Sequence, residues 1–188
     1  MSVHVDLALI HYPVLNKNKE IIGAAVTNLD IHDIARAGRT YGVGAFYIVT
    51  PYEDQRQLVK EIVSHWRSGY GATYNSDRKE ALKVVHVCND LQELYKQVTV
   101  RGQRPVVLAT SAQSPDSVIW SYPQVKEKID QGDRILILFG TAWGLADDVM
   151  EEVDAMLPPI SGGGSYNHLS VRSAASIVLD RLLGADSE

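Results

Sequence analysis

The sequence has few of the features that mark membrane proteins or disulfide-linked domains. Its 188 residues include one cysteine, so no disulfide can form within the chain. The longest uninterrupted aliphatic or aromatic run, "ILILF" at 135–139, is far too short to cross a bilayer, and an Asp interrupts the apolar N-terminal stretch. We therefore expect a soluble cytoplasmic protein with no membrane partner.

Positive charge is not in excess. The chain carries 18 Lys and Arg against 23 Asp and Glu, a formal net charge of −5. This balance argues against a broad basic surface that binds nucleic acid by releasing counterions. A local group of arginines can still hold a few phosphates, so the charge does not exclude an RNA substrate.

Several familiar catalytic and nucleotide-binding motifs are missing. The sequence holds no Gly-x-x-x-x-Gly-Lys-Ser/Thr loop, no Gly-x-Ser-x-Gly elbow, no His-Glu-x-x-His helix and no pair of Cys-x-x-Cys. The glycine-rich "GGGSYN" at 162–167 has Asn167 where the dinucleotide pattern requires Gly or Ala. His86 and Cys88 come nearest to a metal pair, and we expect both to face the core from one strand. We predict no metal site, no P-loop kinase and no ordinary Rossmann dehydrogenase.

What the sequence does contain is an alternation of short apolar runs and helical patterns. The apolar runs predict strands at 5–10, 44–50, 83–88, 106–110 and 134–140. Three-and-four spacing of apolar residues and helix-ending residues such as Gly132 predict helices at 29–42, 53–69, 90–98 and 122–132. The longest loop is expected at 69–81.

The alternation predicts an α/β fold with a mostly parallel sheet flanked by helices. "ILILF" is apolar on both faces, as suits a strand covered by helices on each side. No repeat or composition change divides the sequence, so residues 1–188 are expected to form one domain. In such sheets ligands bind in loops beyond the carboxyl ends of strands, which draws attention to the segments after residues 10, 50, 110 and 139.

Two segments show a pattern of glycines and arginine that is more specific. In "NLDIHDIARAGRTYGVGAFYIVTP" at 28–51, Arg36 lies on a predicted helix six positions before Gly42. In "ILILFGTAWGLADD" at 135–148, a strand is followed by Gly-x-x-x-Gly-Leu, formed by Gly140, Gly144 and Leu145.

A third segment, "LPPISGGGSYNHLSVRSAASIVLDRL" at 157–182, has a Pro-containing turn, then Asn-x-x-Ser-Val at Asn167, Ser170 and Val171, then an Ala-rich helix. Taken in order, the three segments resemble the SPOUT class (SpoU/TrmD-like) of S-adenosylmethionine-dependent RNA methyltransferases, in particular its small single-domain bacterial branch. One departure stands out. SpoU-type members usually carry Asn six positions before the motif Arg, whereas this chain has Asp30 there, with Asn28 two residues earlier.

The resemblance implies a C-terminal deep trefoil knot over roughly 134–184, a homodimer, S-adenosyl-L-methionine as cofactor with S-adenosylhomocysteine as product, and a tRNA or rRNA substrate. Methyl transfer from a sulfonium requires little activation, so the protein mainly binds the cofactor, aligns the nucleophile and manages one proton. Loops at 108–112, 139–145 and 160–170 would offer unpaired amides and carbonyls to the cofactor, and their glycines would let the backbone come close. No added RNA-binding domain is recognised, so we expect the core, a dimer surface or a partner to select the target.

Residue by residue, the resemblance assigns catalytic roles to Arg36, Asn167 and Ser170. The guanidinium of Arg36 stays protonated, which suits it to hold an RNA phosphate or stabilise developing negative charge rather than accept a proton. The cofactor-binding residues that it implies are Leu108, Ala109, Thr110, Phe139, Gly140, Thr141, Gly144, Leu145, Ile160, Tyr166, Asn167, His168 and Leu169.

Structural roles compete with these assignments. Asn167 can cap the final helix while Ser170 returns a hydrogen bond to the turn. Arg36 can pair with Asp33 or Asp30 on the surface of its own helix. Either role would explain the residue without catalysis.

Two further groups have open alternatives. His168 and Arg172 can contact RNA or a second subunit, or can simply be solvated. The segment at 64–82 can stack a splayed RNA base and hold its phosphates, or can form an ordered loop that caps the sheet. Its aromatic and basic residues are Trp66, Tyr70, Tyr74, Arg67, Arg78 and Lys79.

We therefore predict a homodimeric S-adenosylmethionine-dependent RNA methyltransferase. A non-catalytic S-adenosylmethionine-binding, RNA-associated module or regulator is the second hypothesis. A flavodoxin-like nucleotide-binding domain, without knot or dimer, is the third.

Overall fold

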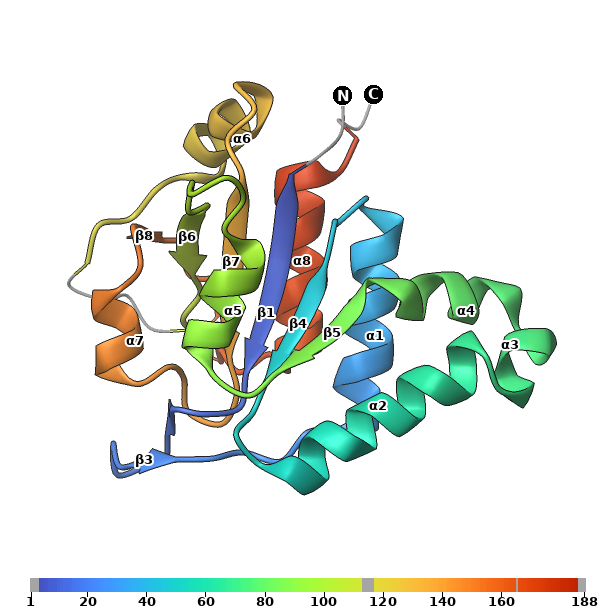
Figure 1. The fold of residues 1–188 in the computed structure, drawn as a ribbon. Coiled ribbons are helices and arrows are strands. Elements are labelled where there is room, and N and C mark those ends of the chain that lie inside the picture. The colour runs from blue at the N-terminus through green and yellow to red at the C-terminus, as the bar shows by residue number, and fades with distance from the viewer. Residues whose placement is uncertain (1–3, 113–116, 165, 186–188) are drawn as a thin grey trace.

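A computed structural model describes residues 4–112, 117–164 and 166–185, which fold around a six-stranded parallel sheet (Figure 1). The strand order is β5-β4-β1-β7-β6-β8, and a separate antiparallel pair joins β2 to β3. The strands are β1 (Val5–Ile10), β2 (Val14–Leu15), β3 (Ile21–Ile22), β4 (Phe46–Val49), β5 (Val85–Cys88), β6 (Val106–Ala109), β7 (Ile135–Gly140) and β8 (Ala155–Met156).

Helices fill most of the connections between strands. They are α1 (Asn28–Thr40), α2 (Glu53–Arg67), α3 (Tyr70–Tyr74), α4 (Ser76–Ala81), α5 (Leu91–Val98), α6 (Tyr122–Asp130), α7 (Asp147–Glu151) and α8 (Val171–Leu183), with a 3-10 turn at Leu82–Val84. The last helix, α8, runs back against the strand direction, so the described chain begins and ends at the amino ends of the strands (Figure 1).

The sheet has a hydrophobic core on each face. Along β1, Leu7 and Leu9 pack on the side covered by α1, α2, α6 and α8, while Ala8 and Ile10 pack on the side covered by α5 and α7. This alternation follows from the two-residue period of a strand. Because both faces are covered, β7 is buried along almost its whole length, as its uninterrupted apolar sequence predicts. The predicted α/β class with a parallel sheet is confirmed.

The predicted loop at 69–81 is wrong, because the segment folds into α3 and α4. The side chain of Asn75 caps α4 by accepting a hydrogen bond from the backbone N–H of Arg78. The Arg78 guanidinium lies 4.3 Å from the centre of the Trp66 ring, so these two side chains hold α4 against α2. Tyr70 and Tyr74 remain exposed. Glycine and asparagine here start helices rather than interrupt them, which local composition alone does not distinguish.

The expectation for His86 is also wrong. His86 is exposed and its ring lies against Tyr47, with 5.3 Å between ring centres, whereas Cys88 is buried as expected. Burial raises the pKa of the Cys88 thiol to about 12. Within the described residues, no group of three His, Cys, Asp or Glu could hold a metal ion. None of the helices in this part of the chain is long and apolar enough to cross a bilayer.

Candidate active site

The segments that follow β3, β6, β7 and β8 line a cavity of about 770 Å³, here called the strand-end cavity. Its walls come from four parts of the chain that are far apart in sequence, namely 24–30, 110–112, 139–144 and 158–178. In parallel sheets the carboxyl ends of the strands form the usual ligand-binding edge. The strand-end cavity is therefore the candidate ligand-binding site.

The loop after β7 contains two glycines that its backbone geometry favours. A Cβ on Gly140 would lie 2.7 Å from the backbone nitrogen of Leu145, and Gly144 has φ +113°, where other residues are strained. Two hydrogen bonds tie this loop to β2: Leu15 N–H donates to the Gly144 carbonyl, and Trp143 N–H donates to the Leu15 carbonyl. The loop is thereby fixed at the cavity wall, with the Trp143 side chain 64% exposed.

The loop before α8 is tied to the loop after β6. The side-chain amide of Asn167 donates to the backbone carbonyl of Ala112 over 2.8 Å. Asn167 does not cap α8, which corrects one of the expectations. Ser170 is the cap, because its hydroxyl accepts from the backbone N–H of Ser173 at 3.3 Å.

The glycine run at 162–164 does not approach the cavity closely. A Cβ built on any of these three glycines meets no atom within 4 Å, and none of the three lines the strand-end cavity. The glycine that permits close packing of the backbone is Gly140, and the conspicuous "GGG" lies in open space. The expectation that these glycines bring the backbone close to a ligand is not supported by this arrangement.

Most of the residues expected to bind the cofactor lie on the wall of the strand-end cavity: Thr110, Phe139, Gly140, Thr141, Gly144, Ile160, Asn167, His168 and Leu169, together with Ser170. Four others do not line it. Leu108 and Ala109 are fully buried within β6, Leu145 is buried beneath the loop, and the Tyr166 side chain is 78% exposed.

Four wall residues come from the segment between β3 and the first turn of α1, namely Ala24, Ala25, Thr27 and Asp30. Of these, only Asp30 was noted in the sequence, as a departure from the family motif and as a possible partner of Arg36. The signal available was a helix start, since the Thr27 hydroxyl accepts from the Asp30 N–H and Asp30 lies in the first turn of α1. Of the other wall residues, Ser111, Ala112, Ala142 and Trp143 lie in the loops predicted to meet the cofactor, and Arg172 was a candidate contact, whereas Pro158, Val171, Ala174 and Val178 were not assigned to a site.

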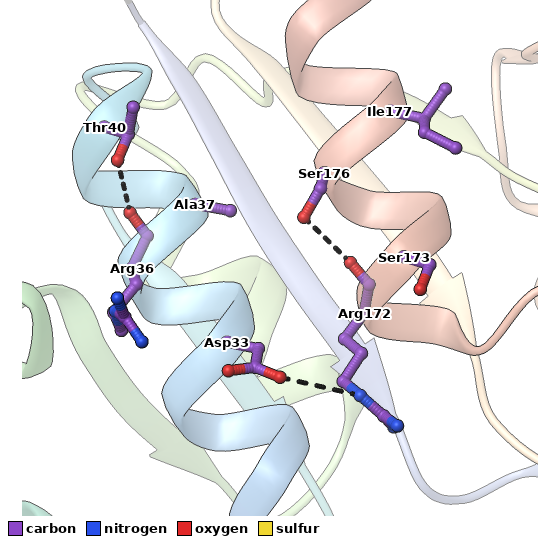
Figure 2. Close-up of a pocket in the computed structure, with 8 residues that line it drawn as sticks. All are labelled: Asp33, Arg36, Ala37, Thr40, Arg172, Ser173, Ser176 and Ile177. Atoms are coloured by element: carbon purple, nitrogen blue, oxygen red, sulfur yellow. Dashed lines mark hydrogen bonds and ion pairs between the residues drawn. The ribbon is translucent and has the colours of Figure 1, made fainter.

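Arg36 lies in a second, open cavity of about 550 Å³ between α1 and α8, here called the α1–α8 cavity (Figure 2). Its wall consists of Asp33, Arg36, Ala37 and Thr40 from α1 and Arg172, Ser173, Ser176 and Ile177 from α8. Arg172 lines both cavities. The two are therefore neighbours that share one cationic side chain.

Arg36 does not form the ion pair with Asp33 or Asp30 that a purely structural role predicted. Arg172 instead pairs with both carboxylates, with its guanidinium 3.4 Å from Asp30 and 3.5 Å from Asp33. Figure 2 shows the Asp33 contact and the separate Arg36 side chain. Among the described residues, the guanidinium of Arg36 makes no hydrogen bond or ion pair, so its charge is available to a ligand.

His11 follows directly after β1 and lies close to Asp30, which lines the strand-end cavity. The residue is fully buried, and neither ring nitrogen makes a hydrogen bond of normal geometry among the described residues, although the backbone of Ala24 and Ala25 lies close enough to favour the charged ring. Burial lowers the pKa of His11 from 6.5 to about 4, although the neighbouring Asp30 carboxylate opposes this shift. The imidazole is therefore neutral near pH 7.

The chain matches a known protein family over nearly its whole length. A family model described as "SAM-dependent RNA methyltransferase" matches residues 4–184. The chain belongs to this family. Membership in the SAM-dependent RNA methyltransferases replaces the flavodoxin-like hypothesis.

Relatives of this methyltransferase-family chain differ in length. It is 46% identical over 178 residues to a "tRNA (guanine-N(1)-)-methyltransferase" of Oleidesulfovibrio alaskensis, covering 94% of this chain but 41% of the relative. It is 39% identical over 185 residues to an "Uncharacterized protein" of Aquifex aeolicus, covering 97% of this chain and 89% of that one. The chain thus spans about two fifths of the first relative and most of the second.

Solved structures share the fold. A probable methylase family protein from Haemophilus influenzae Rd KW20 matches with TM-score 0.64 and 18% identity, covering 97% of this chain and 66% of that one. The SpoU methyltransferase AviRb from Streptomyces viridochromogenes, in complex with AdoMet, matches with TM-score 0.60 and 15% identity, covering 97% and 58%. At these identities the likeness concerns the fold alone.

Proposed function

We propose that this chain transfers a methyl group from S-adenosylmethionine to an RNA, with the cofactor bound in the strand-end cavity. One observation carries the proposal. The loop after β7 and the loop before α8, which bear the resemblance to RNA methyltransferases, and the loop after β6 line one cavity of about 770 Å³. A volume of this size is ordinary for a small-molecule or cofactor site.

The wall offers the mixture of groups that such a cofactor needs. Phe139, Ile160 and Leu169 supply apolar surface for an adenine ring, and the loops supply backbone amides and carbonyls for its edge and for the ribose. Asn167 has a positioning role, because its bond to Ala112 holds two of the three loops together. When bound, S-adenosylmethionine supplies an activated methyl group on a sulfonium, so the protein's tasks are alignment and removal of one proton.

The proposal includes a deep trefoil knot over roughly 134–184 within a single domain of residues 1–188. It is supported by the fold shared with SpoU methyltransferases over 97% of this chain. It is also supported by the position of the loop before α8. This loop lines the same cavity as the loops after β6 and β7, and Asn167 bonds it to the loop after β6. A knot of this kind would fix the cavity walls without a metal or a disulfide.

We propose a homodimer in which Arg36 of one subunit reaches the active site of the other. Arg36 is exposed and free of acidic partners among the described residues, and it lines an open cavity rather than the cofactor cavity of its own chain. Its guanidinium can hold an RNA phosphate or stabilise charge on the nucleophile. Ser170 caps α8 at the cavity wall and contributes through that helix start.

The substrate is proposed to be tRNA or rRNA. The tRNA (guanine-N(1)-)-methyltransferase relatives make guanine in tRNA the first target to test, although this chain corresponds to 41% of each of them. The test is calorimetric titration of the purified protein with S-adenosylmethionine, followed by transfer of tritiated methyl to bulk tRNA and rRNA from a deletion strain. We expect micromolar cofactor binding and incorporation into one RNA class, and mass spectrometry of its nucleosides identifies the product. Cofactor binding without incorporation into either RNA class would contradict the enzymatic proposal.

A non-catalytic module is the second candidate, and the length of the relatives favours it. In the Oleidesulfovibrio and Nitratidesulfovibrio relatives, more than half of the polypeptide lies outside the match, so the named activity can reside elsewhere in them. As a module, the chain would bind S-adenosylmethionine and RNA and would regulate or recruit without turnover. Binding of both ligands with no methyl transfer would select this candidate.

A further inference from the structure

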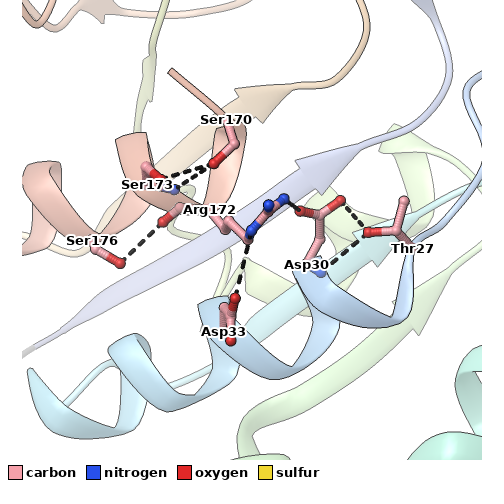
Figure 3. Close-up of polar contacts among 7 residues, drawn as sticks. All are labelled: Thr27, Asp30, Asp33, Ser170, Arg172, Ser173 and Ser176. Atoms are coloured by element: carbon pink, nitrogen blue, oxygen red, sulfur yellow. Dashed lines mark hydrogen bonds and ion pairs between the residues drawn. The ribbon is translucent and has the colours of Figure 1, made fainter.

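Asp30 is a buried carboxylate held in a fixed position at the start of α1. Asp30 is only 6% exposed. The Thr27 hydroxyl donates to one carboxylate oxygen over 2.6 Å, and the Arg172 guanidinium lies 3.4 Å from the other (Figure 3). Partners on two different elements, the N-cap of α1 and the first turn of α8, therefore orient this carboxylate.

Asp30 also lies where the two cavities come together. Asp30 and Arg172 line the strand-end cavity, and Arg172 lines the α1–α8 cavity as well. If the cofactor occupies the strand-end cavity and RNA enters it beside Asp30 and Arg172, the nucleophile meets the methyl group near this pair. This step rests on the proposed function.

The reaction needs a proton acceptor there, and few side chains qualify. Arg36 and Arg172 stay protonated and cannot act as bases. His11 is fully buried, does not line the cavity, and is a weak base because burial lowers its pKa to about 4. His168 lines the cavity but is exposed on the loop before α8. Among the described wall residues, Asp30 is the only carboxylate.

We propose that Asp30 is the general base of methyl transfer. A lone pair on the RNA nucleophile forms the new bond to the methyl carbon as the carbon–sulfur bond breaks, and the bonding pair leaves on sulfur to give the neutral thioether. The proton of the nucleophile passes to a carboxylate oxygen of Asp30, and its N–H or O–H bonding pair stays on the nucleophile. Thr27 and Arg172 hold the carboxylate in position before the transfer.

The test compares Asp30→Asn with Asp180→Asn. The first change keeps the size of the side chain and a hydrogen-bond acceptor but removes the base. The second removes a carboxylate that also links α8 to α1, through a 2.9 Å hydrogen bond from the Tyr41 hydroxyl, away from both cavities. We expect Asp30→Asn to lower the single-turnover rate by about a hundredfold or more. S-adenosylmethionine affinity should stay within about threefold, and Asp180→Asn should leave the rate close to wild type.

The pH dependence separates a base from a merely structural carboxylate. Without Asp30 the nucleophile must lose its proton to solvent first, so the residual rate of Asp30→Asn should rise by about tenfold per pH unit between roughly pH 6 and 8. The wild-type rate should vary less over that range. The titratable or charged groups around Asp30 are Arg172 from α8, His11 from β1, Asp33 on α1 and His168 on the cavity wall. Asp30→Glu, which restores a carboxylate, should recover part of the rate.

Several outcomes would overturn this role. An Asp30→Asn protein that turns over within about threefold of wild type, or that loses cofactor binding as much as activity, contradicts it. The same holds if His168→Gln shows the steep pH dependence and Asp30→Asn does not. A wild-type protein that binds cofactor but methylates no RNA contradicts the proposed function itself, which is a distinguishable result.

Discussion

At the scale of single residues, Arg172 links the two cavities and α1 to α8. It lies in the first turn of α8, where the helix dipole disfavours a positive charge. Asp30 and Asp33 offset this cost through ion pairs at 3.4 and 3.5 Å. Because Arg172 pairs with both carboxylates, the Arg36 guanidinium has no acidic partner in the part of the chain that the structure describes.

Replacing Arg36 by alanine should separate binding from catalysis. We expect Arg36→Ala to bind S-adenosylmethionine within about twofold of wild type, because it lines only the α1–α8 cavity, and to lose methyl transfer by about a hundredfold or more. Calorimetry and tritiated-methyl transfer measure the two effects. Arg39→Ala is the matched control, since Arg39 is also an exposed α1 arginine but reaches Glu80 at 3.9 Å. Wild-type transfer rates in Arg36→Ala would show that the assignment is wrong.

The buried imidazole of His11 should make stability depend on pH. Between its folded pKa of about 4 and its ordinary value of 6.5, the unfolded chain binds a proton that the folded chain does not. The free energy of unfolding should therefore fall as the pH drops from 7 toward 4, by about 2 to 3 kcal/mol from this residue. Urea denaturation of wild type and His11→Gln at pH 7 and 4.5 measures the difference. Because other groups titrate alike in both proteins, equal pH dependence in the two would refute this prediction.

At the scale of elements, the loop from Gly140 to Leu145 is the most constrained part of the site. Gly140→Ala places a Cβ 2.7 Å from the Leu145 backbone nitrogen, so the loop must shift or the protein must lose stability. We expect at least about a tenfold loss of S-adenosylmethionine affinity, measured by calorimetry on protein shown to be folded by circular dichroism. Gly162→Ala is the control, because the same methyl group there enters open space. Equal affinities for the two variants would count against a cofactor site at this loop.

Element boundaries show where sequence reasoning succeeds and where it stops. The strands at 5–10, 106–110 and 134–140 were predictable within a residue because their apolar runs are bounded by polar or turn residues. The cap of α8 was not, because Asn167 and Ser170 are both good capping residues and only the path of the loop chooses Ser170. The helices α3 and α4 were missed because tertiary contacts with Trp66 stabilise them.

At the scale of the whole molecule, the proposed dimer predicts complementation between two inactive variants. If Arg36 acts across the interface, a heterodimer of Arg36→Ala and Gly140→Ala contains one site with both groups intact. An equal mixture, unfolded together and refolded, should recover about a quarter of the wild-type activity, and light scattering should give about twice the chain mass of 20.7 kDa. Unmixed variants treated in the same way are the controls. A dimer without recovered activity would mean that Arg36 serves its own subunit.

The motifs allowed three walls of the strand-end cavity to be predicted but not the fourth. Glycines and Asn-x-x-Ser drew attention to 139–145 and 160–170, and the parallel sheet drew attention to the loop after β6. Ala24, Ala25 and Thr27 had no comparable pattern, because the two alanines contribute only small side chains and Thr27 shows an ordinary helix start, whereas Asp30 was noted only as a departure from the family motif. Their place at the site depends on the three-dimensional course of the chain between β3 and α1.

The direction of α8 determines where the described chain ends relative to the strand-end cavity. Because this helix starts at the strand-end cavity and runs back toward the amino ends of the strands, the described residues at both extremes of the chain lie at the end of the sheet opposite the cavity (Figure 1). Another polypeptide joined by a short linker at either extreme would leave the cavity mouth unobstructed. This arrangement is compatible with the two kinds of relative that the chain matches, one of similar length from Aquifex aeolicus and one of which it covers two fifths.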